Sequence, residues 1–197
     1  MKYFVLSDIH GGGCELEKAL EIYDSLDCDA LVLLGDLLNH GPRNIVPSTY
    51  DPPEVSELLN ERSHEIIAVR GNCDSEVDSM MFRFPCNAPY GYLMVEHENG
   101  IQKIMLTHGQ LFNIETESGC IRSGLKAGDI VFSGHTHESG IKRYKNGIIN
   151  INPGSITLPR GGTEPGYGLI TSKRAAIYTL NNVLVDEYFF EDSHAID

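Results

Sequence analysis

The chain has 197 residues, of which 41% are hydrophobic and 22% charged, and this length and composition are typical of one globular domain. Its formal net charge is −13, and a surface this acidic repels polyanions, which argues against broad binding of nucleic acids. No apolar run approaches a membrane span, and the apolar start of the chain is too short for a signal peptide. We therefore expect a single cytoplasmic domain over residues 1–197, with no membrane contact and with a homo-oligomer left open.

Strand-like and helix-like patterns alternate along the first part of the chain. Short apolar runs at 2–6 and 30–36 predict buried strands, and residues 64–72 predict a third strand; each is followed by a polar turn. Apolar residues at helical spacing predict a helix over 14–26, and a proline pair opens a second helix over 52–63. This alternation is typical of parallel βαβ units.

The remainder of the chain favours antiparallel strands. Residues 90–109 and 141–151 each contain two apolar runs around an Asn-Gly dipeptide, which is typical of hairpin turns. Residues 129–137 predict another buried strand and its loop, and residues 167–190 predict a β-meander. We predict an α/β domain with two sheets, parallel in its first half and mostly antiparallel in its second half.

The cysteines do not form a recognisable framework. Their number is odd and no Cys-x-x-Cys pair occurs, which disfavours a set of disulfides or a structural zinc site. We expect most of them to be buried as small hydrophobic side chains; they are Cys14, Cys28, Cys73, Cys86 and Cys120.

Polar segments directly follow five of the predicted strands. They are SDIH at 7–10, GDLLNH at 35–40, GNCD at 71–74, THG at 107–109 and GHTH at 134–137. Ligand sites of open α/β sheets gather beyond the carboxyl ends of the strands, so these segments can converge on one crevice. Any one of them alone is typical of a turn or a helix cap, but all of them together favour a functional site.

The residue types in these segments predict a metal centre. The candidate ligands are the oxygens of Asp8, Asp36 and Asn72 and the imidazole nitrogens of His10, His108, His135 and His137. This mixture suits Mn, Fe, Zn, Co or Ni better than Ca. In extended backbone, side chains two residues apart point to the same side, so the two ligands within SDIH, and the two within GHTH, should converge. Seven candidates are too many for one ion but enough for two if Asp36 bridges them.

In their order and spacing, these segments resemble the calcineurin-like metallophosphoesterase superfamily. That pattern is D-x-H, then G-D, then G-N followed by His and an acid, then a separate His, then G-H-x-H. Every ligand position of the pattern is filled here. The stretches GDLLNHGPRN, AVRGNCDSEVD and NPGS resemble in particular the small bacterial YfcE-type phosphodiesterases, and the similarity covers nearly the whole chain.

The resemblance implies a four-layer α/β/β/α sandwich of two mixed sheets, with the site at the strand ends. It implies two divalent metal ions, most commonly Mn²⁺, with Fe, Ni, Co or Zn as other occupants. One would be held by Asp8, His10, Asp36 and His137, and the other by Asp36, Asn72, His108 and His135. On this hypothesis, a hydroxide activated by both cations hydrolyses a small phosphodiester without a covalent protein intermediate. The candidate catalytic residues are Asp36, Asn72, Cys73 and His108.

Cys73 departs from the superfamily pattern, which most often has His at this position to assist the leaving group. A thiol cannot become a cation, and a thiolate formed beside two metals would oppose an incoming phosphate. We therefore expect weak leaving-group assistance and a preference for activated diesters; the alternative is that Cys73 only fills a turn. Asp74, with no imidazole to orient, is expected to cap a helix that begins in DSEVDSMM.

Asn39, His40 and Arg43 are the candidate substrate-binding residues, because a guanidinium such as that of Arg43 suits bidentate contact with phosphate. The alternative for Arg43 is a solvated loop arginine. Ser155 and Arg160 are weaker candidates, in a loop that equally fits a turn packed on the second sheet. Two other functions stay open. The acidic charge opposes an exonuclease of the same fold, and the intact ligand set opposes a non-catalytic metal-binding scaffold.

Overall fold

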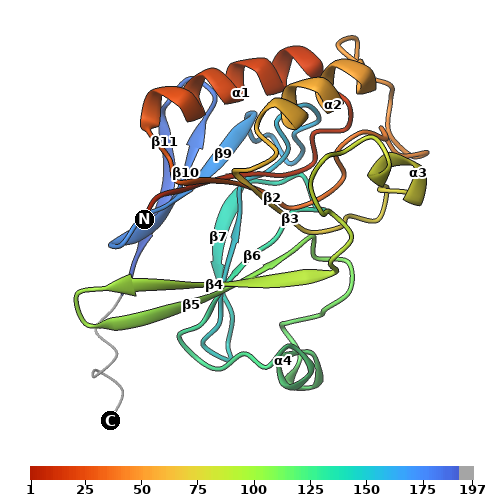
Figure 1. Cartoon of the computed structure of the whole chain (residues 1–197). Helices are drawn as coiled ribbons and strands as arrows, with labels where there is room; N and C mark the ends of the chain where they lie inside the picture. Colours follow the sequence, from red (N-terminus) through yellow and green to blue (C-terminus); the bar gives the residue numbers. More distant parts are fainter. Residues whose placement is uncertain (191–197) are drawn as a thin grey trace.

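The computed structural model describes residues 1–190, apart from the side chains of residues 117, 120 and 121. The prediction for the Cys120 side chain therefore lies outside the described residues. Two β-sheets stack face to face, with the longer helices covering the outer face of one of them (Figure 1). This arrangement confirms the predicted α/β sandwich of two mixed sheets.

The first sheet has six strands in the order β11-β10-β9-β1-β2-β3. Their bounds are β1 (Tyr3–Leu6), β2 (Ala30–Leu33), β3 (Ile66–Ala68), β9 (Gly166–Ile170), β10 (Arg174–Thr179) and β11 (Leu184–Phe189). β1, β2 and β3 are parallel, as the βαβ pattern predicts, whereas β9 runs antiparallel to β1. The C-terminal meander therefore extends the N-terminal sheet rather than forming part of the other one.

The second sheet has five strands in the order β4-β5-β6-β8-β7. Their bounds are β4 (Tyr90–His97), β5 (Gly100–Thr107), β6 (Ile130–Phe132), β7 (Gly140–Arg143) and β8 (Ile149–Asn152). β6 is parallel to both β5 and β8, so the prediction of a mostly antiparallel second half is wrong for this sheet. The reason is the long connection between β5 and β6, which carries the chain back to the start of the sheet, as a parallel pair requires.

The helices are α1 (Gly13–Leu26), α2 (Pro52–Glu61), α3 (Glu76–Ser79) and α4 (Glu117–Ser123). α1 buries Leu16, Ala19, Leu20 and Tyr23, the face that its helical spacing predicts, against the first sheet. Asp51 caps α2, since its side chain accepts a hydrogen bond from the backbone N–H of Glu54. α4 lies on the far side of the second sheet (Figure 1). Among residues 1–190, no helix has both the length and the apolarity that crossing a membrane requires.

An apolar core joins the two sheets. Val5 and Val32 of the first sheet and Ile104, Phe132 and Ile151 of the second are fully buried in one cluster. Strands packed in this way are rigid, so loops at their ends hold side chains in fixed positions. The core therefore supports the edge where the polar segments lie.

The described cysteines differ from the prediction that most of them are buried. Cys86 is buried, Cys28 and Cys73 are half-buried, and Cys14 is exposed, and each of these four is a free thiol. Cys14 faces solvent because it lies in the first turn of α1, away from the side that packs on the sheet.

Candidate metal centre

The predicted ligands follow the carboxyl ends of five strands. Asp8 and His10 follow β1, Asp36 follows β2, Asn72 follows β3, His108 follows β5, and His135 and His137 follow β6. The strands come from both sheets, and their ends meet at one edge of the sandwich. The structure thus brings all seven predicted ligand candidates together, although they span 130 positions of the sequence, from 8 to 137.

The loops that carry these residues have a left-handed backbone. The φ angles of Asp8, His10, Asp36, His135 and His137 are 54°, 48°, 56°, 70° and 63°. We expected extended backbone to direct the two ligands within SDIH, and the two within GHTH, to the same side. This expectation is wrong for the backbone, which is left-handed, although the side chains do converge. A non-glycine residue in this region costs of order 1–3 kcal/mol, and such strain is concentrated at functional sites.

Close approach between the loops explains the glycines in the motifs. The backbone N–H of Asp8 donates to the Gly35 carbonyl at 3.1 Å, so the first two loops run side by side. A Cβ atom on Gly35 would collide with the backbone of Gly71, and a Cβ on Gly134 would collide with the side chains of Ser7 and Asp8. Glycine at these positions lets the loops touch.

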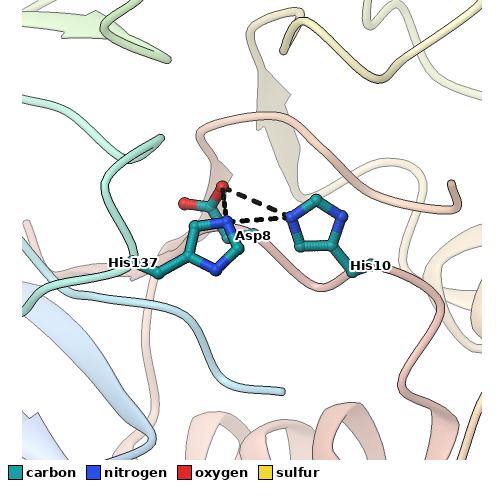
Figure 2. Close-up of side chains that lie close together, drawn as sticks. All are labelled: Asp8, His10 and His137. Atoms are coloured by element: carbon teal, nitrogen blue, oxygen red, sulfur yellow. Dashed lines mark hydrogen bonds and ion pairs between the residues drawn. The ribbon is translucent and has the colours of Figure 1, made fainter. Parts of the chain in front are cut away.

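One group of donors consists of Asp8, His10 and His137 (Figure 2). Oδ1 of Asp8 lies 3.7 Å from Nε2 of His10 and 3.3 Å from Nε2 of His137. The two imidazole Nε2 atoms are 3.1 Å apart. All three side chains are at least nine-tenths buried, so water screens their charges little.

The backbone fixes which imidazole nitrogen faces the site. Nδ1 of His10 lies 2.7 Å from the Asn39 carbonyl oxygen, and Nδ1 of His137 lies 2.8 Å from that of Leu158. A carbonyl oxygen only accepts, so each Nδ1 carries the proton and each Nε2 presents a lone pair. Two lone pairs 3.1 Å apart repel each other unless a cation or a proton lies between them.

Asp8 shows that the donors fit a divalent cation. Its Oδ2 accepts hydrogen bonds from the Ser7 hydroxyl at 2.7 Å and from the His135 backbone N–H at 2.9 Å. Its Oδ1 is buried and has no hydrogen-bond partner among the described residues. A buried carboxylate oxygen without a donor is costly, and a metal ion that accepts electron pairs from it removes that cost.

A second group of donors surrounds Asp36. Oδ2 of Asp36 lies 3.3 Å from Nε2 of His108 and 3.7 Å from Nε2 of His10. Nε2 of His108 also lies 3.2 Å from Oδ1 of Asn72 and 3.3 Å from Nδ1 of His135. Asp36 Oδ2 therefore stands between the two groups. Oδ1 of Asp8 also approaches the second group, but it lies farther from Nε2 of His108, at 3.9 Å.

Charge interactions among the ligand candidates lower the pKa of the Asp8 carboxyl and raise the pKa of the His108 imidazole. Burial alone would raise the pKa of the Asp8 carboxyl, but the His10 and His137 imidazoles, when Nε2 also carries a proton, outweigh it and hold that pKa well below its usual range. Burial alone would lower the pKa of His108, but the Asp36 and Asp8 carboxylates outweigh it and raise that pKa to about 9. Ionised carboxylates are therefore ready to bind a cation in place of the imidazole proton.

Asp74 does not cap a helix, contrary to the prediction. Ser75 is the N-cap of α3, and its side chain forms a reciprocal capping box with Asp78. The Asp74 carboxylate instead accepts hydrogen bonds from the backbone N–H groups of Asp36, Leu37 and Gly71, at 2.8, 2.8 and 2.7 Å. It thus joins the loops after β2 and β3 and fixes the backbone that carries Asp36.

Sequence reasoning also missed the role of the segment after β8. The Ser155 hydroxyl donates to the Asp8 carbonyl at 2.6 Å, and the Thr157 hydroxyl donates to the Ile9 carbonyl at 2.7 Å. The Asn152 amide donates to the Gly134 carbonyl at 2.9 Å. The NPGS segment therefore holds the loops after β1 and β6 together. In the sequence, only its polar residues next to a buried strand indicated this role.

A pocket of about 300 Å³ is lined by five of the ligand candidates, which are His10, Asp36, Asn72, His135 and His137. Asn39 and Arg43, two of the predicted substrate-binding residues, line it. His40 does not line it, because its ring turns to Tyr50, with ring centroids 5.4 Å apart. Arg160, a weaker candidate, does line the pocket and donates a hydrogen bond to Asn44 across its rim.

Comparisons with known proteins agree with this geometry. The family model described as calcineurin-like phosphoesterase superfamily domain matches residues 1–175. The chain belongs to the calcineurin-like phosphoesterase superfamily.

Relatives of this phosphoesterase are similar over most of their length. The phosphodiesterase YfcE of Escherichia coli K12 is 41% identical over 182 residues, which cover 92% of this chain and 94% of YfcE. A solved structure of the E. coli phosphoesterase YfcE matches with a TM-score of 0.87 at 38% identity, covering 97% of this chain and 100% of that one. The probable metallophosphoesterase YsnB of Bacillus subtilis is 27% identical, over 89% of this chain and 87% of YsnB. The predicted resemblance to YfcE-type proteins is confirmed.

In this phosphoesterase, Cys73 lines the pocket next to Asp36 and Asn72. Its backbone N–H donates to Oδ1 of Asp36 at 2.7 Å, and its Sγ lies 3.1 Å from the Asn72 amide nitrogen. Burial, followed by the charges of Asp36 and Asp74, raises the pKa of the Cys73 thiol to about 12. The thiol is therefore neutral at neutral pH. The backbone N–H of Cys73 orients the Asp36 carboxylate.

Proposed function

We propose that this chain is a metal-dependent phosphodiesterase that works with two divalent cations. The observation that carries the proposal is the position of Asp36 Oδ2, within 4 Å of imidazole nitrogens in both donor groups. A carboxylate between two sets of ligands is the arrangement that a pair of metal ions needs. The 41% identity to the E. coli phosphodiesterase YfcE supports a diester as the substrate.

The proposed ligands divide between the two sites by their contacts. Asp8, His10, Asp36 and His137 would hold one cation, and Asp36, Asn72, His108 and His135 would hold the other. When bound, two such cations polarise phosphoryl oxygens and lower the pKa of water at the site. We propose Mn²⁺ as the usual occupant, with Fe, Ni, Co or Zn able to replace it, since these ions share carboxylate and imidazole ligands.

The residues of the chain bind and orient the substrate in this proposal. Arg43 lines the pocket with a guanidinium that suits bidentate contact with a phosphate oxygen, and Asn39 lines the same pocket. Asn72 contributes a neutral oxygen, so the donor set is less negative than a third carboxylate would make it. The overall charge of −13 makes a small diester a better substrate than a nucleic acid.

Cys73 supports the preference for a diester. The position beside Asn72 holds a thiol, which cannot carry a positive charge towards a leaving oxygen. A diester with an activated leaving group needs little protonation, whereas a monoester, which carries more negative charge, gains more from a nearby cation. Cys73 is therefore proposed to line the pocket and orient Asp36 through its backbone rather than to act as an acid.

The proposal is tested by metal content and turnover. The purified chain should bind close to two metal ions per molecule, hydrolyse bis-p-nitrophenyl phosphate with Mn²⁺, and lose that activity in a chelator. A chain that binds no metal and is inactive with Mn²⁺ would refute the proposal. Metal binding without any turnover would favour the scaffold alternative, and faster cleavage of single-stranded DNA than of the small diester would favour the exonuclease.

We further expect a cytoplasmic protein that acts on a small phosphodiester. Its oligomeric state is a separate question, which size-exclusion chromatography with light scattering answers directly.

A further inference from the structure

Two arginines from different segments line the pocket that holds five of the ligand candidates. Arg43 lies in the loop after β2, and Arg160 lies in the segment after β8. Apart from the ligand candidates, the described residues that line this pocket include no other charged side chain. The chain has 28 acidic and 15 basic residues, so two positive charges here without an acid beside them run against its composition.

The backbone of Arg160 is fixed to one of the proposed metal ligands. Its N–H donates to the His137 carbonyl at 2.9 Å, and two residues earlier the Leu158 carbonyl holds Nδ1 of His137 at 2.8 Å. The Arg160 carbonyl accepts from the backbone N–H and the hydroxyl of Thr163, at 3.0 and 2.8 Å. The Arg160 side chain therefore starts from a fixed point beside His137.

Asn44 determines the direction of the Arg160 guanidinium. The Asn44 amide nitrogen donates to the His40 carbonyl at 2.7 Å, which leaves the amide oxygen to accept from Nη2 of Arg160. This hydrogen bond joins the loop after β2 to the segment after β8. A guanidinium has more N–H donors than this one bond uses, so the others are available to a ligand in the pocket.

The Asn44–Arg160 hydrogen bond lies close to the proposed metal site. A Cβ atom on Gly41 would lie 3.2 Å from the Asn44 amide nitrogen and 4.0 Å from Cε1 of His10. The same atom would lie 3.0 Å from Sγ of Cys73. The space beside a single glycine therefore separates Asn44 from a proposed metal ligand, so one small substrate can reach both.

Neither guanidinium of the pocket is neutralised by a neighbouring acid. Among the described residues, Arg43 and Arg160 form no ion pair, whereas Arg62 pairs with Asp24 at 2.6 Å. Glu138 lies close to the backbone that follows Arg160, but it does not line the pocket. Both positive charges are therefore available to an anionic ligand.

We propose that Arg43 and Arg160 bind a second phosphate group of the substrate, carried by one of its two ester groups. The reacting diester has one negative charge, which the proposed cations meet. Two guanidiniums match a phosphate monoester, which carries nearly two negative charges at neutral pH, better than a carboxylate, which carries one. The inference rests on the proposed phosphodiesterase function and adds the substrate class, a small phosphodiester with a further phosphate.

Two esters that differ only in this phosphate test the proposal. Thymidine 5′-(p-nitrophenyl phosphate) is a diester without it, and the 3′-phosphorylated form of the same ester carries it on the sugar. With Mn²⁺, kcat/KM should be at least about tenfold higher for the 3′-phosphorylated ester, the scale of a hydrogen bond to a charged group. The overall charge of −13 favours the opposite order, so it cannot produce this preference.

Matched variants locate the source of the preference. Arg160→Gln should lower the ratio of the two kcat/KM values, and the double variant with Arg43→Gln should bring them to within about twofold of each other. Arg160→Lys keeps the charge without the planar fork and should give an intermediate ratio. Arg83→Gln removes an exposed arginine that does not line the pocket and should keep the wild-type ratio. A wild-type ratio near one, or equal ratios in Arg160→Gln and Arg83→Gln, would overturn the proposal.

Binding of two nucleotides separates a failure of the phosphate site from a failure of the proposed activity. Thymidine 3′,5′-bisphosphate and thymidine 5′-phosphate differ by the same group, and titration calorimetry with Mn²⁺ compares their affinities. If both esters are cleaved equally well and both nucleotides bind equally, the phosphate site is wrong and the phosphodiesterase proposal stands. If neither ester is cleaved, yet the bisphosphate binds at least about tenfold tighter and Arg160→Gln reduces this difference, the phosphate site stands and the proposed activity is wrong.

Discussion

The Asp74 carboxylate accepts a 2.8 Å hydrogen bond from the backbone N–H of Asp36, across 38 positions of the chain. The same carboxylate oxygen accepts from Gly71, and its partner oxygen accepts from Leu37. Asp36 is the residue proposed to face both metal ions, and its backbone has a left-handed φ of 56°. Asp74 therefore stabilises the strained turn that aims the central ligand.

Replacing Asp74 with Ala should destabilise both the fold and the proposed metal site. Three backbone N–H groups lose a charged acceptor, and hydrogen bonds to charged groups contribute about 1.5–3 kcal/mol each. We expect the free energy of unfolding in urea to fall by about 3 kcal/mol and metal affinity to fall with it. Asp78→Ala is the control, since it removes only the capping box of α3; equal effects of the two variants would contradict this role for Asp74.

Replacing His108 with Ala should empty one of the two proposed metal positions. Its Nε2 faces Asp36, Asn72 and His135, whereas the Asp8–His10–His137 group does not need it. Bound metal should fall from two ions to one, and diester hydrolysis should fall by more than about a hundredfold. His64→Ala, at an exposed position, should change neither quantity. Full metal content in the His108 variant would disprove the assignment.

Replacing Cys73 with His should raise activity on phosphomonoesters. An imidazole can carry the positive charge that a thiol cannot, and general acid assistance contributes at least about a hundredfold. The ratio of p-nitrophenyl phosphate to bis-p-nitrophenyl phosphate hydrolysis should therefore increase. Cys73→Ser keeps the size and lacks the charge, so it should leave the ratio unchanged. If the ratio rises equally in both variants, leaving-group assistance is not the reason for it.

Removing the metal ions should lower the thermal stability of the protein. Without a cation, the buried Oδ1 of Asp8 lacks a partner among the described residues, and Nε2 atoms of His10 and His137 face each other at 3.1 Å. Metal at about 100 times its dissociation constant adds about 2.7 kcal/mol by mass action. Thermal unfolding with Mn²⁺ and with chelator measures the difference. Ca²⁺ at the same concentration should give a smaller shift, and an equal shift would argue against selective nitrogen ligands.

Tyr23 should make the protein less stable in alkali. Burial, followed by the hydrogen bond to Glu65 at 2.8 Å, raises the pKa of the Tyr23 phenol above its ordinary value of 10.0. Below pH 10 both the folded and the unfolded chain keep this proton. As the pH rises further, only the unfolded chain loses it, so stability falls by at most about 1.4 kcal/mol per pH unit.

Tyr23→Phe is the variant that tests this dependence. It removes the titrating group, so its urea midpoint should fall less steeply from about pH 9 to about pH 11 than that of the wild type. Tyr167 also has a raised pKa, of about 12, so some alkaline loss should remain. Identical slopes for the two proteins would show that Tyr23 does not titrate differently in the folded state.

Much of the site was predictable from the sequence because its chemistry lies in short motifs. SDIH, GD, GN, THG and GHTH supply oxygen and nitrogen donors directly after apolar strands, and the ends of packed strands meet at one edge. These local features predicted all seven residues that the structure brings together. They also predicted the strands and helices of the N-terminal half, where the hydrophobic spacing is regular. A single domain stays a prediction, which the shared core of the two sheets supports.

Other features depend on contacts between distant segments, which no local pattern encodes. His40 and Arg43 lie in one loop, yet only Arg43 reaches the pocket, because the ring of Tyr50 receives His40. The parallel pairing of β5, β6 and β8 depends on the path of a long connection, and the left-handed turns depend on hydrogen bonds between loops.

The role of Asp74 separates what the sequence determined from what the tertiary structure decided. The sequence by itself determined which donors the site contains and that they follow strand ends, since side-chain chemistry and hydrophobic periodicity are local. Only the tertiary structure decided that Asp74 binds the backbone of Asp36 instead of capping a helix, because both roles satisfy a carboxylate. The partner of Asp74 lies 38 positions away in the sequence. Ser75 caps α3, so the Asp74 carboxylate is free to bind the backbone of Asp36.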